Sequence, residues 1–386
     1  MGEWIGRGRK ARRSYGFDEI ALVPGRKTID PEDVDISWEI GGQKYPAPII
    51  AAAMDGVVDV RFAIEMGRLG GLAILNLEGV QTRYEKPDEV LEEIARAMPQ
   101  QATELVQKLY LQPVKDELIF KRIKEIKDTG APAVVSAIPQ KAEPYAKIAL
   151  EAGVDIFVVQ ATVTTTVHES THYKALDFQE FCKKMPVPVI IGNAVTHEVV
   201  LDLMATGAAG ILIGIGPGAA CTTRGVLGLG VPQVTATVDA AWARDFHYKQ
   251  TGRYVPVIAD GGMSAGGDIC KAIAAGADAV VVGSAFARAR EAPGRGYHWG
   301  MATPHANLPR GTRIHVGTTG TLEEILVGPA RLDDGSQNLI GALKTCLGCV
   351  GARNIREFQL TELVIAPEIK TEGKIFQRTQ HIGMGK

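Results

Sequence analysis

One cysteine, Cys221, stands in a setting that could support nucleophilic chemistry. It lies in a glycine-rich stretch, residues 214–224, directly after the apolar run 210–213. The apolar run predicts a buried strand, so the cysteine is expected on a tight turn at the carboxyl end of that strand. Glycines let the backbone approach a ligand, and neighbouring hydroxyls and a guanidinium can support a thiolate. The stretch therefore predicts a catalytic thiol, with a small residue packed in a tight loop as the alternative.

Seven further apolar runs recur along the chain, and each is continuous rather than alternating. They cover residues 48–52, 72–75, 133–137, 155–159, 187–191, 255–259 and 279–282. Continuous apolar runs are typical of parallel strands that are covered on both faces. Three of the eight runs follow a glycine that we interpret as a helix C-cap, namely Gly153, Gly207 and Gly276. Eight strand–helix units predict a (β/α)8 TIM barrel, with a doubly wound open sheet as the alternative.

The 386 residues are expected to form a single barrel domain with several additions. Residues 79–130 predict helices between the second and third strands. Residues 288–335 carry glycines and prolines and few apolar runs, which we interpret as an extended, mobile active-site flap. An N-terminal arm over residues 1–35 begins with basic residues that we interpret as a solvated tail, and residues 355–386 form a C-terminal segment.

The composition excludes several classes of protein. A net charge of -2 argues against binding to nucleic acid or to a membrane surface. No apolar stretch reaches the roughly 18 residues that a membrane span requires. Five scattered cysteines do not predict a disulfide framework, so a reducing, cytoplasmic compartment is expected.

Two glycine-containing loops predict a phosphate site. Residues 260–264 and 282–284 follow the seventh and eighth predicted strands. In TIM barrels the loops after these two strands commonly bind phosphate through backbone N–H groups. Ser284 can add a hydroxyl donor, whereas the Asp260 carboxylate would repel a phosphate and is expected to accept from ribose hydroxyls. The two loops therefore predict a ligand that carries both a phosphate and a ribose.

The order of these motifs resembles that of the inosine 5′-monophosphate (IMP) dehydrogenase/guanosine 5′-monophosphate (GMP) reductase family, over nearly the whole chain. The segments that carry the resemblance are FDEIALVP at 17–24, AAMD at 52–55, GNAVT at 192–196, GIGPGAACTTR at 214–224, VPQ at 231–233, ADGG at 259–262, GS at 283–284 and EAPG at 291–294. The chain is similar to the members without CBS domains, since the connection between the second and third strands is too short to hold a CBS pair.

The resemblance implies covalent catalysis on a purine nucleotide. Cys221 would attack C2 of IMP, a hydride would pass to NAD, and water would hydrolyse the thioimidate to xanthosine 5′-monophosphate. Thr223 would help to position water or protons, and Arg310 is the candidate for activating the water. The resemblance also implies a cytoplasmic homo-oligomer, either a tetramer or an octamer.

The same resemblance implies binding roles for particular residues. The substrate would be contacted by Met54, Asp260, Gly262, Gly283, Ser284, His298, Gly300 and Met301. The cofactor NAD would be contacted by Gln160, Asn193 and Gly214. A K⁺ ion would be held by the carbonyls of Gly216, Gly218 and Cys221.

Four positions depart from the family pattern. Ala219 replaces a serine that contacts phosphate, Gln160 replaces an aspartate near the nicotinamide ribose, and His298 replaces a tyrosine. Val316 replaces a glutamate or glutamine, and because GMP reductases use this glutamate to expel ammonia, the valine favours the dehydrogenase. An NADPH-dependent GMP reductase and a catalytically inactive nucleotide-binding regulator are the alternatives.

Overall fold

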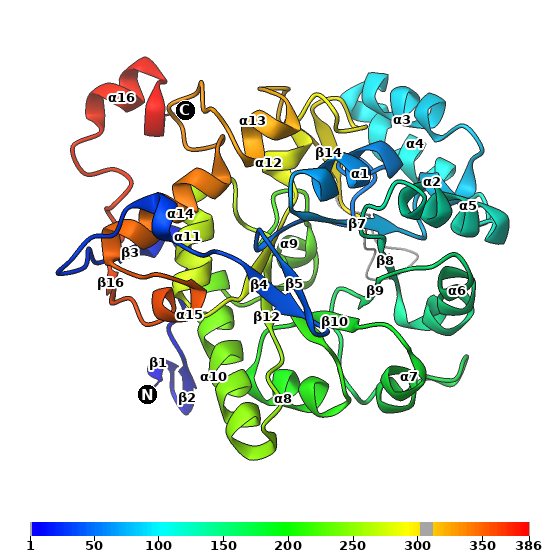
Figure 1. The fold of residues 1–386 in the computed structure, drawn as a ribbon, viewed down its shortest axis with the longest axis horizontal. Helices are drawn as coiled ribbons and strands as arrows, with labels where there is room; N and C mark the ends of the chain where they lie inside the picture. The colour runs from blue at the N-terminus through cyan, green and yellow to red at the C-terminus, as the bar shows by residue number, and fades with distance from the viewer. Residues whose placement is uncertain (1, 302–311, 386) are drawn as a thin grey trace.

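The computed structural model describes residues 2–301 and 312–385, and its centre is a closed barrel of eight parallel strands (Figure 1). The strands are β6 (Ile49–Ala51), β7 (Leu72–Asn76), β8 (Val134–Ala137), β9 (Ile156–Gln160), β10 (Val189–Ala194), β11 (Gly210–Ile213), β12 (Val257–Asp260) and β13 (Ala279–Val282). Each strand pairs with the next along the chain, and β13 closes the barrel on β6 through Val281 and Ile50. The predicted TIM barrel is confirmed, and each strand lies in or overlaps one of the eight apolar runs.

Helices follow the strands and cover the outside of the barrel (Figure 1). They are α1 (Val60–Arg68), α6 (Pro139–Glu151), α7 (Phe178–Lys184), α8 (His197–Ala205), α10 (Gln233–Thr251), α11 (Gly266–Ala274) and the short α12 (Ser284–Ala287). Gly153, Gly207 and Gly276 have φ values of +87°, +98° and +114°, so each takes the left-handed region that a helix-ending glycine favours. The predicted C-caps are therefore correct to within a residue.

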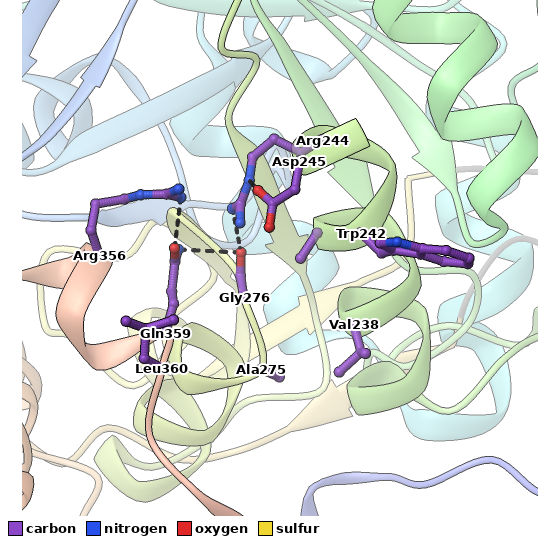
Figure 2. A pocket seen from close by; sticks show the side chains of 10 residues that line it. Val238, Trp242, Arg244, Asp245, Ala275, Gly276, Arg356, Gln359 and Leu360 are labelled. Atoms are coloured by element: carbon purple, nitrogen blue, oxygen red, sulfur yellow. Dashed lines mark hydrogen bonds and ion pairs between the residues drawn. The ribbon is translucent and has the colours of Figure 1, made fainter. Parts of the chain in front are cut away.

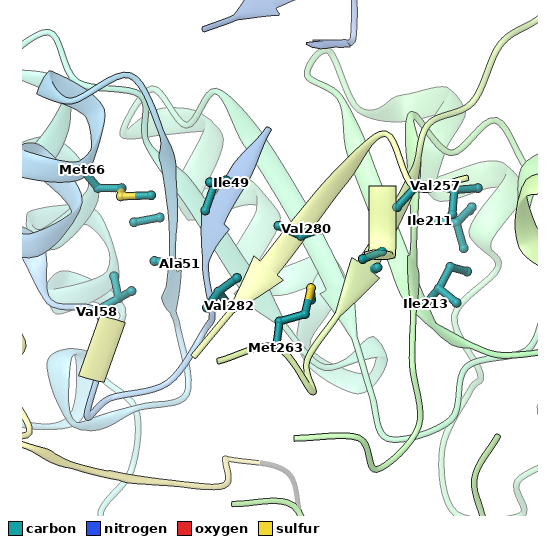
Figure 3. Packing of buried hydrophobic residues seen from close by; sticks show 14 of the residues in the cluster. Ile49, Ala51, Val58, Met66, Ile211, Ile213, Val257, Met263, Val280 and Val282 are labelled. Atoms are coloured by element: carbon teal, nitrogen blue, oxygen red, sulfur yellow. The ribbon is translucent and has the colours of Figure 1, made fainter. Parts of the chain in front are cut away.

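Alternate residues of each strand are buried on opposite faces, which explains why the runs are continuously apolar. Figure 3 shows Ile49 of β6 and Val280 of β13 packed among side chains such as Met66 from the surrounding helices. Their neighbours Ile50 and Val281 belong to the cluster inside the barrel. That inner cluster also takes Trp38 and Tyr45 from the hairpin β4 (Trp38–Ile40) and β5 (Gln43–Tyr45).

Both predicted additions contain regular structure. The insertion after β7 forms α2 (Val80–Arg83), α3 (Pro87–Arg96), α4 (Pro99–Leu109) and α5 (Asp116–Lys127). The segment 288–335 differs from the expected loop, because it contains an antiparallel hairpin, β14 (Tyr297–Trp299) and β15 (Arg313–His315), followed by α13 (Leu322–Leu326). No alternating apolar pattern marks this hairpin in the sequence, and the fully buried Trp299 anchors it. The mobility of the segment stays a prediction.

The chain ends pack on the outside of the barrel. An exposed hairpin, β1 (Glu3–Gly6) and β2 (Arg9–Ala11), precedes β3 (Ile20–Leu22), which pairs with β16 (Leu363–Ile365). The remaining C-terminal helices are α14 (Leu339–Val350), α15 (Ile355–Phe358) and α16 (Ile375–Gln380). Across the two described ranges, none of the helices has the combination of length and apolarity needed to cross a membrane.

Candidate active site

Cys221 lies on the loop that follows β11, as the sequence predicts. Its backbone N–H donates to the Gly218 carbonyl at 3.0 Å, which forms a tight turn immediately before the short helix α9 (Thr223–Leu227). The side chain is exposed, and its Sγ lies 3.2 Å from the hydroxyl of Thr223, which is buried. The structure thus pairs an accessible thiol with a fixed hydroxyl at the carboxyl end of a barrel strand.

Arg224 closes the loop that carries Cys221. Its guanidinium donates to the carbonyls of Ile215 at 3.3 Å and Val231 at 3.0 Å, so it joins the two ends of the loop. Gly216, with φ of +73°, lies directly on the Arg224 side chain, where a Cβ would come within 2.7 Å of Cγ. The arginine that follows the thiol in sequence therefore fixes the backbone of this loop.

Asp260 is the centre of a polar cluster at the same end of the barrel. Its Oδ2 accepts hydrogen bonds from Gln160 Nε2 at 2.9 Å and from Asn193 Nδ2 at 2.8 Å. Gln160 Nε2 also donates to Asn193 Oδ1 at 3.0 Å, so residues of β9, β10 and β12 form one network. Burial raises the pKa of Asp260 to about 6, and the two amide hydrogen bonds act in the opposite direction by stabilising the carboxylate.

The Asp260 loop packs against the cysteine loop. Gly261 and Gly262 have φ values of +86° and +83°, and a Cβ on either would come within 3.3 Å or less of Pro217. Gly214, with φ of +145°, lies so close to the Asp260 carbonyl that a Cβ would be 2.4 Å away. These close approaches, which only glycine allows, hold the thiol and the carboxylate on adjoining loops.

The structure also brings together Ser284 and His298, which the family resemblance assigns to the substrate. Ser284 begins α12, and its Oγ lies 3.2 Å from Nε2 of His298 on β14. His298 is 2% exposed, and burial lowers its pKa to about 4, so the imidazole is neutral near pH 7. Met54 packs against Gly283 beside this pair, where a Cβ on the glycine would lie 3.1 Å from the methionine sulfur.

A buried network beneath Met301 was not found by sequence reasoning. Trp299 Nε1 donates to the Tyr110 hydroxyl at 2.9 Å, and that hydroxyl donates to the Asp55 carboxylate. Asp55 also accepts from the backbone N–H of Val80 at 2.7 Å, and Tyr110 lies 3.4 Å from the Met301 sulfur. The network joins the AAMD loop, the helical insertion and the β14–β15 hairpin. Asp55 lies in the AAMD segment, whereas Tyr110, directly after the end of α4, belongs to no motif.

The predicted water-activating residue, Arg310, lies outside the described residues. The described arginine nearest to it in sequence, Arg313, is engaged elsewhere. Its guanidinium donates to the carbonyls of Ala95 at 3.1 Å and Ala97 at 2.7 Å, and it lies 4.4 Å from the centre of the Tyr297 ring. Arg313 therefore ties β15 to the end of α3. Gly300 is described and continues the chain from β14 to Met301.

Comparisons with known proteins show the family to which this chain belongs. Residues 14–373 match the family model described as the IMP dehydrogenase/GMP reductase domain. An uncharacterized oxidoreductase of Mycolicibacterium smegmatis is 39% identical over 370 residues, covering 94% of this chain and 99% of that protein. The inosine-5′-monophosphate dehydrogenase of Methanocaldococcus jannaschii is 28% identical, and the match covers 91% of this chain and 92% of that protein.

A solved structure extends the comparison to three dimensions. The crystal structure of an IMP dehydrogenase/GMP reductase-like protein from Corynebacterium glutamicum matches with a TM-score of 0.89 and 38% identity, over 94% of this chain and 96% of that chain. The family model spans all eight barrel strands and includes Cys221, Asp260 and Ser284. The chain belongs to the IMP dehydrogenase/GMP reductase family.

Proposed function

We propose that the protein is an NAD-dependent IMP dehydrogenase that oxidises IMP to xanthosine 5′-monophosphate through a covalent bond to Cys221. The observation that carries the proposal is the exposed Cys221 thiol, 3.2 Å from Thr223 on a loop packed against the Asp260 loop. The relationship to the M. jannaschii dehydrogenase, at 28% identity over most of both chains, supports it.

The nucleotide would be held by residues from three loops. Asp260 accepts from the ribose hydroxyls, and both of its hydrogen bonds from Gln160 and Asn193 end on Oδ2. Across the described residues Oδ1 receives no hydrogen bond, so it stays free for the ligand. Gly262, Gly283, Ser284 and His298 would contact the phosphate, and Met54, Gly300 and Met301 the purine.

The neutral His298 suits a phosphate neighbour. With its proton on Nε2, the imidazole donates to Ser284 and leaves the serine hydroxyl proton for a phosphate oxygen. With the proton on Nδ1, Nε2 accepts from the serine hydroxyl and the Nδ1–H group is the remaining donor. Nδ1 is buried and has no hydrogen-bond partner among the described residues. Either tautomer therefore offers one hydrogen-bond donor beyond the pair itself.

In the proposed reaction the Cys221 sulfur forms a bond to C2 of the purine. NAD, when bound, accepts the hydride that leaves C2. Water then cleaves the carbon–sulfur bond, which gives xanthosine 5′-monophosphate, a proton and the free thiol. The Thr223 hydroxyl, fixed at the start of α9, holds the thiol proton or a water beside the reacting sulfur.

The residues assigned to the cofactor and the cation are compatible with those ligands. Both carboxamide hydrogen bonds of Gln160 use Nε2, so Oε1 can accept from a ribose hydroxyl of NAD. Asn193, which accepts from Gln160, and Gly214, which packs on the Asp260 carbonyl, are the other residues assigned to NAD. Backbone carbonyls are suitable ligands for K⁺, and Gly216, Gly218 and Cys221 all belong to the loop between β11 and α9. The Gly218 oxygen accepts from Cys221 and keeps a second lone pair for an ion.

A GMP reductase is the second candidate, because the family model describes both activities. The dehydrogenase must activate water to release its product. A reductase forms the same bond to Cys221 with loss of ammonia and then receives a hydride from NADPH, so it needs no hydrolysis.

Two assays on the purified protein decide between these activities. With IMP, NAD and K⁺ the proposal expects absorbance from NADH to rise. Oxidation of NADPH by GMP, without reaction of IMP, would replace the dehydrogenase by the reductase. Tight binding of IMP with no chemistry in either direction would make the protein a catalytically inactive regulator.

A further inference from the structure

The N-terminal hairpin exposes apolar side chains that nothing in residues 2–301 and 312–385 covers. Every residue of β1 and β2 is exposed, including Trp4 at 66% and Ile5 at 65%. Lys10 lies across the strand pair from Trp4, with its ammonium 4.7 Å from the indole centre. A two-stranded hairpin is marginal in water by itself. Residues 2–11, called the arm below, therefore present a surface that needs a partner.

Helix α10 exposes a matching stripe of apolar side chains. Val238, Trp242 and Phe246 lie four residues apart on one face and are 45%, 65% and 44% exposed. Trp242 is supported from beneath by His197 of α8, at 4.6 Å between ring centres. These three side chains are called the α10 stripe below.

A cavity of about 260 Å³ opens beside the α10 stripe (Figure 2). Figure 2 shows Val238 and Trp242 projecting from α10 on one side, with Arg356 and Leu360 on the other. Leu360 is 84% exposed and extends the apolar surface across the opening. The cavity lies beside the Ala275–Gly276 turn that precedes β13, so it is separate from the loops that carry Cys221 and Asp260.

The charges of the two surfaces are complementary. The arm and its base carry five cationic side chains against one carboxylate, Glu3, and the cations are Arg7, Arg9, Lys10, Arg12 and Arg13. Around the α10 stripe stand Asp245, on the same helix, and two exposed acidic residues of α8, Glu198 and Asp202. Two cations line the cavity, and both are engaged within the chain: Arg244 pairs with Asp245 and Asp278, and Arg356 bonds to Tyr254 and Gln359.

The root of the arm is fixed to the helix that carries the stripe. Arg12 donates to both carboxylate oxygens of Asp239, which is the residue after Val238, and the Tyr15 backbone N–H donates to Thr235 at 2.8 Å. Figure 1 places the hairpin beside α10 accordingly. The arm is therefore attached to α10, the same helix that carries the α10 stripe. Two copies related by a two-fold axis beside α10 can each lay an arm on the other's stripe, which is a closed, self-complementary contact.

We propose that the arm of one copy of this chain docks on the α10 stripe of a second copy, with Trp4 and Ile5 against Trp242, Phe246 and the adjoining cavity. The contact would bury the exposed aromatic residues of both surfaces at once. It would also set the arm's arginines beside the carboxylates of α8 and α10. The inference does not depend on the proposed enzymatic activity.

Photocrosslinking of the full chain tests the contact. p-Benzoylphenylalanine replaces Ile5 in an unlabelled chain, which is co-assembled with heavy-isotope-labelled wild-type chain and irradiated. The proposal expects mixed-isotope crosslinks between the arm and the peptide that contains residues 238–246. It also expects loss of these crosslinks when the labelled chain carries Trp242→Ser and Phe246→Ser. Crosslinks to α10 within one chain, to another surface, or none at all would overturn the proposal.

The stability of the assembly gives a second readout. Deletion of the arm and the double substitution in the stripe should each raise the dissociation constant of the oligomer at least tenfold, measured by analytical ultracentrifugation. The matched control is Phe376→Ser, which changes an aromatic side chain that is 74% exposed on α16 and should leave the constant unchanged. A wild-type chain that is monomeric, or equal constants for wild type and both variants, would contradict the proposal.

Discussion

The Gln160 carboxamide donates a hydrogen bond of 2.9 Å to the Asp260 carboxylate, from the end of β9 to the end of β12. This residue, assigned to the cofactor from sequence, therefore also supports the group expected to hold the substrate ribose. Gln160→Ala should raise the KM for the nucleotide about tenfold, because a hydrogen bond to a charged group contributes roughly 1.5–3 kcal/mol. The KM for the nucleotide and for NAD are measured separately.

The matched control for Gln160 is Gln140→Ala, since Gln140 is an exposed residue of α6 that bonds to Tyr173. It should leave both KM values unchanged. If Gln160→Ala raised only the KM for NAD, the carboxamide would serve the cofactor alone and its support of Asp260 would be without consequence.

Asp260 should make nucleotide binding dependent on pH. Its pKa is raised to about 6, so the carboxyl group is ionised above that pH and becomes protonated as the pH falls through it. Only the ionised form can accept from the ribose hydroxyls with both oxygens. Affinity for IMP, measured by calorimetry, should therefore fall on the acidic side of pH 6. The phosphate of the ligand also titrates near pH 6, so Asp260→Asn is the necessary comparison. That variant should bind more weakly at pH 8 and keep only the dependence due to phosphate; an unaltered profile would remove Asp260 from the site.

His298 should make the folded protein sensitive to acid. Its pKa is lowered to about 4 by burial, whereas an unfolded histidine titrates near 6.5. Between these values the unfolded chain binds the extra proton, so stability falls as the pH drops from about 6.5 towards 4. The loss should be about 2 kcal/mol at pH 5 relative to pH 7, measured by urea unfolding. His298→Gln should lose less, whereas the exposed His172→Gln should behave as wild type. Equal losses for all three proteins would show that His298 is not the titrating group.

Tyr110 should couple the β14–β15 hairpin to the barrel. Tyr110→Phe removes the hydroxyl between Trp299 and Asp55 and leaves buried polar groups without that partner. We expect the free energy of unfolding to fall by about 1–3 kcal/mol in urea titrations. Tyr248→Phe, at a half-exposed tyrosine of α10, is the control and should have little effect. A Tyr110→Phe variant as stable as the control would show that the hydroxyl network contributes nothing.

The barrel could be predicted because its evidence is local. Each strand has helices on one face and the barrel interior on the other, so it appears in the sequence as a short apolar run that ends in a loop with polar or glycine residues. The apolar run at 187–191 ends before β10 does. The strand continues to Ala194, because Ala194 still pairs with Ile213 of β11. A pairing of this kind depends on the neighbouring strand and is not visible in the residues themselves.

The parts that sequence missed depend on contacts between distant segments. Asp55 and Tyr110 are 55 positions apart, and Trp299 is a further 189 from Tyr110. Nothing near Tyr110 marks its hydroxyl as a bridge. Trp299 is completely buried, so it anchors the β14–β15 hairpin and is not accessible for stacking on a bound base. The grouping of Cys221, Asp260 and Ser284 was predictable, since each lies at or after the carboxyl end of a strand and all carboxyl ends of a barrel meet at one face.

The central claim is that the Cys221 sulfur becomes bonded to the purine. Mass spectrometry of protein quenched during reaction with IMP and NAD, and separately with GMP and NADPH, tests it most directly. The account predicts a nucleotide adduct on the peptide that contains Cys221, in one of the two reactions, and neither adduct nor turnover in a Cys221→Ala variant that still binds nucleotide. An adduct on a different side chain, or turnover retained by Cys221→Ala, would contradict it.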